Sequence, residues 1–364
     1  MPISSWKKAK KTLCVRLDTV GDVLMTSPAF RALRESGNRP ALTLLTSSIG
    51  AAIGRLIPEI DEVLTYDCPW MKATEPRRSA EIDGDLIARL KAERFDAAVI
   101  FTVFSQNPLP AALLCYLAEI PLRLAYCREN PYQLLSDWVP EQDSRHKARH
   151  EVRRQLDLVA AVGASTRNER LSLYVPKNAV ERVQQVLRKT GIDLNGVWVV
   201  VHPGASAPSR RYPSDKFAEV AGLVLSELGA QVVFTGAASE MALVQDIRQK
   251  VPHRTHSVAG LLSLAELAAL VRLAPLLISN NTGPVHIAAA LGTPVVDIYA
   301  LTNPQHTPWG VESRVLFHDV PCKNCFKSVC PEGHHHCLTL VTPRAVLQAT
   351  RDLLEKRVLE LARG

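Results

Sequence analysis

A single carboxylate near the N-terminus, that of Asp22, has the surroundings of a catalytic base. The apolar run 12–17 predicts a buried strand, a tight turn containing Gly21 follows it, and an amphipathic helix begins around Asp22. Open α/β sheets bind ligands at the carboxyl ends of their strands, and a helix N-terminus stabilises an ionised carboxylate. Asp22 is therefore a candidate general base. The alternative interpretation is that its side chain only caps the helix.

The loop after a second apolar strand, 197–201, has the residue types of a phosphate site. It begins at His202, is rich in small and hydroxyl residues, and carries Ser206 and the pair Arg210 and Arg211. A guanidinium group can hold a phosphate with two parallel hydrogen bonds, and exposed backbone amides add to the attraction. An ordinary loop between a strand and a helix rarely combines these features, so we predict an anion site here.

A second anion site is predicted where the strand 276–279 meets the next helix. Thr282 and Gly283 precede Pro284, whose missing N–H costs nothing in the first turn of a helix. The free amides and the dipole at that helix N-terminus attract an anion. His286, one turn further on, is either a ligand contact or a hydrogen-bonded structural histidine. Two anion sites within one domain indicate a diphosphate.

A third polar side chain, that of Glu240, follows the strand 231–235. Its carboxylate is suited to hold the two hydroxyls of a ribose, and the alternative is that it belongs to the first turn of a helix. No Walker loop and no G-x-G-x-x-G turn accompanies these sites. The sequence therefore lacks the fingerprints of an ATPase and of a dinucleotide-dependent dehydrogenase.

The short motif Asp83-Gly84-Asp85 resembles the DxD that holds a divalent metal in some sugar transferases. It directly precedes the amphipathic run 86–90, and acidic residues are common at the start of a helix. We therefore interpret this motif as a helix start and predict no cofactor for catalysis.

Four cysteines near the C-terminus, Cys322, Cys325, Cys330 and Cys337, are close together, with three histidines (334–336) inside their last interval. In a reducing compartment, clustered thiols point to a metal more than to disulfides. Four thiolates suit zinc or a single iron ion, and such a site is structural because no ligand position stays open. A disulfide or redox pair and free thiols are the alternatives. The other cysteines fall at apolar positions and predict buried thiols: Cys14, Cys68, Cys115 and Cys127.

Composition predicts two globular domains with anionic partners. The chain has 364 residues, and 43 Lys and Arg against 36 Asp and Glu give a net charge of +7. The excess is concentrated at 6–11 and 145–154, which are either anion-binding stretches or solvated helix faces. No signal-peptide pattern and no membrane-length apolar run is present, which predicts a cytoplasmic protein that could still touch the inner face of the membrane. The basic stretches lack interleaved aromatic residues, which disfavours nucleic-acid binding.

The elements that must position these side chains alternate between strands and helices, which predicts two doubly wound α/β domains. We place an N-terminal domain at 1–175, a second domain at 176–342 and a last helix, 343–364, that packs back toward the first domain. Strands are predicted at 12–17, 42–46, 62–66, 97–102, 122–126, 197–201, 231–235, 276–279 and 295–300. Helices are predicted at 28–35, 84–94, 147–162, 177–190, 214–229, 238–250, 263–273, 284–291 and 343–361.

Three motifs and the cysteine cluster together resemble the ADP-heptose:lipopolysaccharide heptosyltransferases, family 9 of the glycosyltransferases. They are the opening RLDxxGDVLxTxP, the loop HPGAS…SRRYP, the segment NNTGPVHIAAALGTP and the run CxxCF…CPxGHHHCL. The resemblance spans nearly the whole chain. It implies the GT-B architecture, with two Rossmann-like domains facing each other across a cleft, an acceptor in the first and a nucleotide sugar in the second. It also implies an inverting transfer without a catalytic metal.

The resemblance also implies roles for particular residues. Asp22 corresponds to the base, Ser206 and Arg210 to diphosphate contacts, and Glu240 to a ribose contact. Thr282 and Gly283 correspond to the diphosphate cradle, with Gly21, His202 and His286 nearby in the same motifs. The chain departs from the family at Asn281, where an aspartate is usual, so a charge is lost while the shape is kept.

We therefore predict an inverting glycosyltransferase that moves a heptose from ADP-heptose to an anionic, lipid-linked core oligosaccharide. Two alternatives stay open at this point. One is a transferase on the same scaffold that uses another nucleotide sugar or a protein acceptor. The other is a non-catalytic module that binds a nucleotide.

Overall fold

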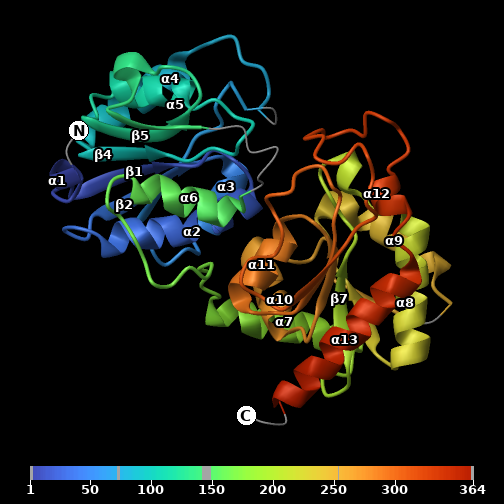
Figure 1. The fold of residues 1–364 in the computed structure, drawn as a ribbon. Helices are drawn as coiled ribbons and strands as arrows, with labels where there is room; N and C mark the ends of the chain where they lie inside the picture. The colour runs from blue at the N-terminus through green and yellow to red at the C-terminus, as the bar shows by residue number, and fades with distance from the viewer. Residues whose placement is uncertain (1–2, 72–73, 142–148, 253, 362–364) are drawn as a thin grey trace. The chain divides into compact units, whose positions relative to one another are not determined.

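The computed structural model describes residues 3–71, 74–141, 149–252 and 254–361. The chain divides into two compact units, Met1–Tyr174 and Val175–Gly364, and each is described here by itself. Each unit has a six-stranded sheet with helices packed around it (Figure 1). All strand pairs in the two sheets are parallel, so the predicted doubly wound α/β fold is confirmed.

The first sheet has the strand order β3-β2-β1-β4-β5-β6. The order in which the chain adds strands therefore reverses between β1 and β4, which is the topological switch point of the sheet. The central strands are apolar because both of their faces are covered. Its strands are β1 (Lys11–Val15), β2 (Ala41–Thr46), β3 (Glu62–Thr65), β4 (Ala97–Ile100), β5 (Leu122–Cys127) and β6 (Asp137–Pro140). Its helices are α1 (Ile3–Trp6), α2 (Val20–Glu35), α3 (Ser48–Gly54), α4 (Glu81–Ala92), α5 (Leu109–Leu117) and α6 (Glu151–Ala160), with a 3-10 turn at Tyr132–Leu134.

The helix α2 continues through Pro28, whose lack of an N–H would leave the carbonyl of Leu24 without its usual partner. The hydroxyl of Ser27 donates to that carbonyl at 2.7 Å. This substitute bond helps α2 to run unbroken from the site at its N-terminus to Glu35, which joins the predicted helix start around Asp22 to the predicted helical pattern at 28–35.

The second sheet has the order β12-β11-β10-β7-β8-β9. Its strand order also reverses once, between β7 and β10, as in the first sheet. Its strands are β7 (Trp198–His202), β8 (Gln231–Phe234), β9 (His256–Ser257), β10 (Leu277–Asn280), β11 (Val295–Ile298) and β12 (Ser313–Leu316). Its helices are α7 (Lys177–Thr190), α8 (Ser214–Leu228), α9 (Met241–Lys250), α10 (Leu264–Leu273), α11 (Gly283–Leu291), α12 (His336–Thr339) and α13 (Pro343–Leu361), with 3-10 turns at Pro208–Arg210 and Ala238–Glu240.

The sequence prediction missed β6, β9 and β12, and all three are edge strands of their sheets. No residue of β12 is buried, β6 alternates between half-buried and exposed residues, and β9 has two residues. An edge strand with a solvated side lacks the continuous apolar run by which the central strands are recognised.

The last helix, α13, lies on the core of the second unit, and its predicted packing toward the first domain stays a prediction. It packs on α8, β11 and β12 of its own unit (Figure 1). Val346, Leu347 and Leu353 join the apolar core of that unit because they repeat at helical spacing on one side. The boundary between the two units, after Tyr174, lies one residue from the predicted one.

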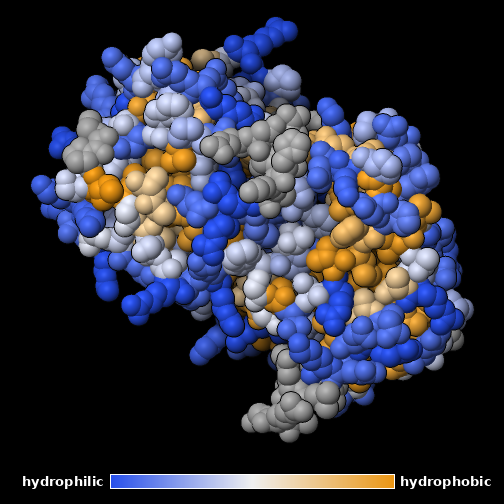
Figure 2. Space-filling view, in the orientation of Figure 1, coloured by the Kyte–Doolittle hydropathy of each residue, from blue (hydrophilic) through white to orange (hydrophobic). Residues whose placement is uncertain are grey.

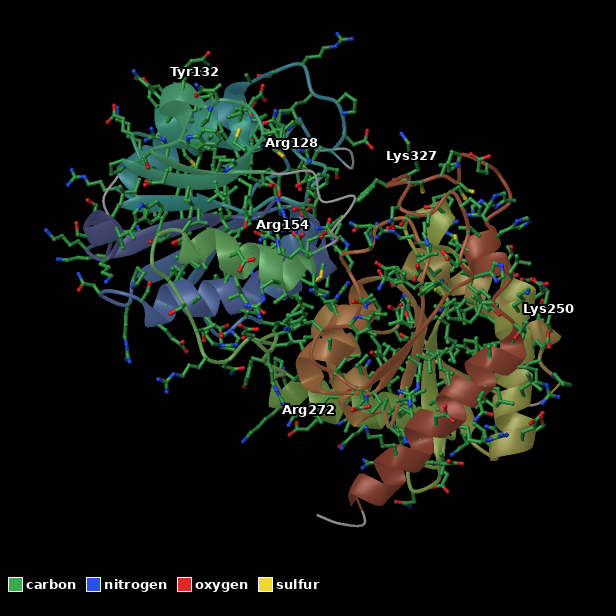
Figure 3. The ribbon with its side chains drawn as sticks, in the orientation of Figure 1. Arg128, Tyr132, Arg154, Lys250, Arg272 and Lys327 are labelled. Atoms are coloured by element: carbon green, nitrogen blue, oxygen red, sulfur yellow. The ribbon has the colours of Figure 1, made fainter. Side chains whose placement is uncertain are left out.

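Charged and polar side chains cover most of the visible face of each unit, and apolar residues form scattered patches (Figure 2). In the basic stretch 145–154, Arg149 pairs with Asp157 at 2.6 Å, and Arg154, labelled in Figure 3, is buried against Glu141. Residues 145–148 of that stretch lie outside the described residues. No helix in the described parts of the chain has the length and apolar character needed to cross a membrane. The four scattered cysteines are buried as predicted.

Replacing Leu353 by alanine is expected to lower the free energy of unfolding of the second unit by about 2–5 kcal/mol, because a fully buried leucine leaves a cavity. Urea unfolding followed by tryptophan fluorescence and circular dichroism measures this. Glu355→Ala, on an exposed position of the same helix, is the matched control. An equal loss in both variants would contradict the packing of α13 described above.

Candidate active site

In the second unit, the predicted site residues follow neighbouring strands at the topological switch point, where the strand order reverses between β7 and β10. His202, at the end of β7, pairs in register with Ser279 near the end of β10, and β8 lies on the other side of β7. The loops after these strands therefore share one edge of the sheet, where doubly wound folds bind nucleotides.

Glu240 lies directly over the loop that follows β7. A β-carbon built on Gly204 would be 1.9 Å from the Glu240 carboxylate oxygen Oε1, so a glycine is needed at that position. Glu240 also accepts a hydrogen bond from the backbone N–H of Ala237 at 2.8 Å. Glu240 therefore belongs to the start of a helix, as one interpretation predicted, and its carboxylate also lies beside the loop after β7.

His202 is buried next to Glu240, with 3.8 Å between its Nε2 and the carboxylate oxygen Oε2. Burial lowers the pKa of His202, and the opposing attraction of Glu240 is weaker. Among the described residues, the ring atom Nδ1 has no hydrogen-bond partner. His202 is thus a neutral, buried side chain with an unused polar atom.

The two arginines of the loop differ in what they do. Arg211 donates from Nε to the carbonyl of Ala205 at 2.8 Å and so holds the loop in shape. Arg210 is half-buried, and no described carboxylate pairs with it. Ser206 is exposed in the same loop. Arg210 and Ser206 are therefore the residues of this loop that are available to a ligand.

Asn280, which the sequence analysis did not single out, ties the two anion-site loops together. Its side-chain amide donates to the carbonyl of Pro203 at 2.7 Å, and its side-chain oxygen accepts from the N–H of Tyr212 at 3.1 Å. The buried Asn280 therefore fixes both ends of the loop after β7 to the end of β10. Its position beside a second asparagine was the only signal in the sequence.

The side chain of Asn281 is used inside the unit. Its amide donates to Asp297 Oδ2 and to the carbonyl of His306, both at 2.9 Å. Burial raises the pKa of Asp297 to about 8, against the hydrogen bond from Asn281, which lowers it. Asn281 was predicted as a ligand contact, but both of its N–H groups are already engaged by this network.

The N-terminus of α11 is formed by Thr282 and Gly283, both half-buried, as predicted. The Thr282 hydroxyl donates to the carbonyl of Asn280 at 3.3 Å. His286, by contrast, is only 4% exposed and lies in the interior of the unit. The structural interpretation of His286 therefore fits its position better than a ligand contact does.

In the first unit, Asp22 is both a helix cap and part of a buried charge cluster. Its Oδ2 accepts from the Thr19 hydroxyl at 2.8 Å and from the Thr19 N–H at 3.3 Å. Its Oδ1 lies 3.4 Å from Arg16 Nη2, and the side chain is 14% exposed. Gly21 already belongs to α2, so the predicted tight turn lies before it rather than at it.

Arg16 is the centre of that cluster, and the sequence analysis did not single it out. Its guanidinium is fully buried and lies 3.1 Å from Asp18 and 3.0 Å from Glu151, in addition to Asp22. Burial opposes the charge, but these carboxylates outweigh it and raise the pKa of Arg16. Burial also raises the pKa of Asp18 to about 6.

A cavity of about 250 Å³ lies at the carboxyl ends of β1 and β4, beside this cluster. Trp70, Met71 and Phe101 line it together with Gln106, whose amide donates to Asp18. Asp83, from the motif considered above, accepts hydrogen bonds from Tyr66 and Arg77. Its place in the first turn of α4 agrees with a helix start.

The four clustered cysteines, with His334, line one small cavity of the second unit, and none of them forms a disulfide. In the part of the chain that the structure describes, no group of three or more His, Cys, Asp and Glu side chains is already arranged to hold a metal ion.

Comparison with known proteins gives one consistent result. A sequence model described as glycosyltransferase family 9 (heptosyltransferase) matches residues 84–336. The lipopolysaccharide heptosyltransferase 2 of Salmonella typhimurium is 24% identical over 359 residues, covering 95% of this chain and 99% of the relative. A crystal structure of a family 9 glycosyl transferase from Veillonella parvula has a TM-score of 0.81 at 21% identity, covering 95% of this chain and 98% of the other. The structure of E. coli ADP-heptose lps heptosyltransferase II has a TM-score of 0.74 at 23% identity and covers 95% and 99%.

Asp297→Asn is expected to change how stability depends on pH. Because the pKa of Asp297 is raised from 3.8 to about 8, the folded chain holds a proton that the unfolded chain releases. The free energy of unfolding therefore falls as pH rises from about 4 to about 8, by at most about 1.4 kcal/mol per unit. The variant lacks this contribution, so its stability relative to the unmodified chain should rise across that range.

Thermal unfolding of both proteins at intervals from pH 4 to pH 9 measures this difference. The exposed Asp193→Asn in the same unit is the control. A stability difference for Asp297→Asn that stays constant with pH would show that the buried carboxyl group ionises normally.

Proposed function

The chain belongs to glycosyltransferase family 9, and we propose that it transfers a heptose from ADP-heptose to a hydroxyl of a lipopolysaccharide core acceptor. The observation that carries the proposal is the polar edge of the second unit, where the loops after β7, β8 and β10 meet. Such an edge suits a nucleotide diphosphate. Heptose as the transferred sugar is supported by relatives named lipopolysaccharide heptosyltransferase 2.

The donor is proposed to bind with its diphosphate at Arg210 and at the N-terminus of α11. A guanidinium that pairs with no carboxylate of the described residues and the helix amides at Thr282 and Gly283 both favour negative charge. Ser206 adds a hydroxyl, and Glu240 accepts hydrogen bonds from the ribose hydroxyls. The unused Nδ1 of His202 is a further polar contact at this edge.

In the proposed reaction, the acceptor oxygen attacks the anomeric carbon of the heptose while the bond from that carbon to the diphosphate breaks. ADP leaves from the opposite face, and the configuration inverts. Asp22 takes the proton of the acceptor hydroxyl. A carboxylate is a far weaker base than an alkoxide, so the proton moves as the new bond forms. Most of the acceleration then comes from positioning and from stabilising the leaving diphosphate, without a catalytic metal.

We further propose that the enzyme acts at the inner face of the cytoplasmic membrane on an anionic, lipid-linked acceptor. Lys7, Lys8 and Lys10 are exposed near the N-terminus and would attract anionic headgroups or core sugars. The second basic stretch contributes less, because its described arginines are paired with acidic side chains.

A transferase for a different nucleotide sugar was the main alternative, because Asn281 replaces the usual aspartate. The contacts of Asn281 give this exchange a structural reason. An aspartate there would place a second carboxyl group against the buried Asp297, which is unfavourable for both. The asparagine therefore does not by itself argue for a different donor, and release of the corresponding nucleoside diphosphate, compared across several nucleotide sugars, decides between them.

Asp22→Asn is expected to lower kcat by a factor of about 100 or more, since general bases contribute roughly 10²–10⁴. The Kd for ADP should change less than about threefold, because the nucleotide is bound by the second unit. Release of ADP from ADP-heptose measures kcat, and calorimetry measures the Kd.

Thr19→Ala separates the base role from the cap role. It removes a hydrogen bond to Asp22 and costs about 1 kcal/mol of stability, while the carboxylate remains. Most of the activity should therefore be retained. An equal loss of activity in Thr19→Ala and Asp22→Asn would indicate that Asp22 serves only as a cap.

Arg210→Ala is expected to weaken ADP binding roughly 10- to 100-fold, because a charge-assisted hydrogen bond contributes about 1.5–3 kcal/mol. Arg272→Ala, at the end of α10 and labelled in Figure 3, removes the same charge from the same unit and is the matched control. Calorimetric titration with ADP compares the two. Equal affinities in both variants would place the diphosphate elsewhere.

A further inference from the structure

The segment 322–337 brings four thiols and two imidazoles, those of His334 and His335, around a single cavity of about 20 Å³, room for one small ion. Cys322 and His334 are 12 residues apart in the sequence, and 3.8 Å separates Cys322 Sγ from His334 Nε2. All four cysteines are free of disulfides. The segment thus gathers soft ligands in one place without linking them covalently.

The hydrogen bonds of His334 determine how it meets the sulfur. Its Nδ1 accepts from the backbone N–H of His336 at 2.9 Å, so in the neutral ring the proton is on Nε2. That N–H is directed at the sulfur of Cys322. The imidazole is therefore placed to orient the sulfur of Cys322 rather than to act as a ligand itself.

The apolar support of this segment comes from its first and last cysteines, since Cys322 and Cys337 pack against the small buried cluster of Tyr299, Leu301 and Val320. None of the residues 321–337 is buried, and the backbone is left-handed at the non-glycine residues Asn324, Phe326 and His335. Such conformations persist only where the surroundings enforce them, and small segments without a core are usually held by a disulfide or a metal. Backbone hydrogen bonds and the packing of Cys322 and Cys337 support the segment, and because the thiols are free, a metal bound by them would add a cross-link to these contacts.

The segment also contacts the loop 203–213 after β7, called the donor loop here because it contains Ser206 and Arg210. The buried Ser209, beside Arg210, donates from its N–H to the carbonyl of Ser328 at 3.1 Å and from its hydroxyl to the carbonyl of Lys327 at 2.8 Å. Lys327 itself is labelled on this segment in Figure 3. The backbone N–H groups of Asn324 and Phe326 add bonds to the chain after β11. A displacement of the backbone at Lys327 and Ser328 would therefore break or shift the two hydrogen bonds that hold Ser209.

We propose that the four clustered cysteines bind one zinc or iron ion as thiolates, and that this ion holds the loop of Ser209 and Arg210 in position. The sulfurs close in on the ion when it binds, because structural metal sites are rarely preformed without their metal. Four thiolates leave no open position, so the ion has a structural role. Only the link to nucleotide affinity rests on the function proposed above.

Metal analysis of the untagged, anaerobically purified chain tests the site. About one equivalent of zinc or iron per chain is expected, and Cys325→Ser and Cys330→Ser should each reduce it at least fivefold. Cys115→Ala, a buried thiol of the first unit, and Val329→Ala, an exposed residue of the same segment, are the controls and should keep the metal. Replacement by cobalt(II) should give the visible absorption of a tetrahedral thiolate site.

Trypsin tests the link to the donor loop without any nucleotide. Cleavage after Arg210 and Arg211 should become at least fivefold faster when the metal is removed and should slow again when zinc or iron(II) is restored. Ser209→Ala should keep the metal but also speed cleavage, because one of its two bonds to the segment is lost. The Kd for ADP should rise severalfold under the same conditions.

Three results would overturn the proposal. The first is less than 0.1 equivalent (roughly) of bound metal in the fresh protein, with or without disulfides among the four cysteines. The second is full metal retention in both serine variants. The third is a cleavage rate at Arg210 and Arg211 that does not depend on the metal, which would reject the link to the loop. A chain that binds metal but not ADP would reject the proposed donor and leave this site intact.

Discussion

Both units depend on one constraint, which is that every strand of their sheets points the same way. Parallel strands put all of their carboxyl ends on one edge of the sheet. Where the strand order reverses, between β1 and β4 and between β7 and β10, the loops after the two strands run to opposite faces and leave room for a ligand at that edge. The polar side chains of the two candidate sites follow these strands directly. Their chemistry is therefore located by the sheet topology, and the loops only select which groups are presented.

The buried polar groups at this edge of the sheet need hydrogen-bond or charge partners, and the two units provide these partners in different ways. In the second unit, neutral asparagines join the loops, with Asn280 bridging Pro203 and Tyr212 and Asn281 held against Asp297. In the first unit, a buried guanidinium is shared by three carboxylates. Removing one member of either network would leave a buried polar group unpaired, which costs more than the bond itself contributes.

The sequence was sufficient for what depends on continuous apolar runs and on turn chemistry. The central strands were predicted to within a few residues, and α7 and α13 had the predicted bounds. It was insufficient where a partner distant in the chain decides the role of a residue. Arg16 and Glu151 are 135 residues apart, and no local pattern indicates that they pair. The packing of α13 and the difference between Arg210 and Arg211 are likewise decided by tertiary contacts.

Asp22 shows why a structural and a catalytic interpretation of one residue need not exclude each other. The bonds from Thr19 and the nearby Arg16 that make it a cap also fix the carboxylate in one orientation at the start of α2. A base that is already oriented does not have to be immobilised during the reaction, and this saves much of the entropic part of the barrier. The cap is therefore a means of positioning the base, and the two roles require the same geometry.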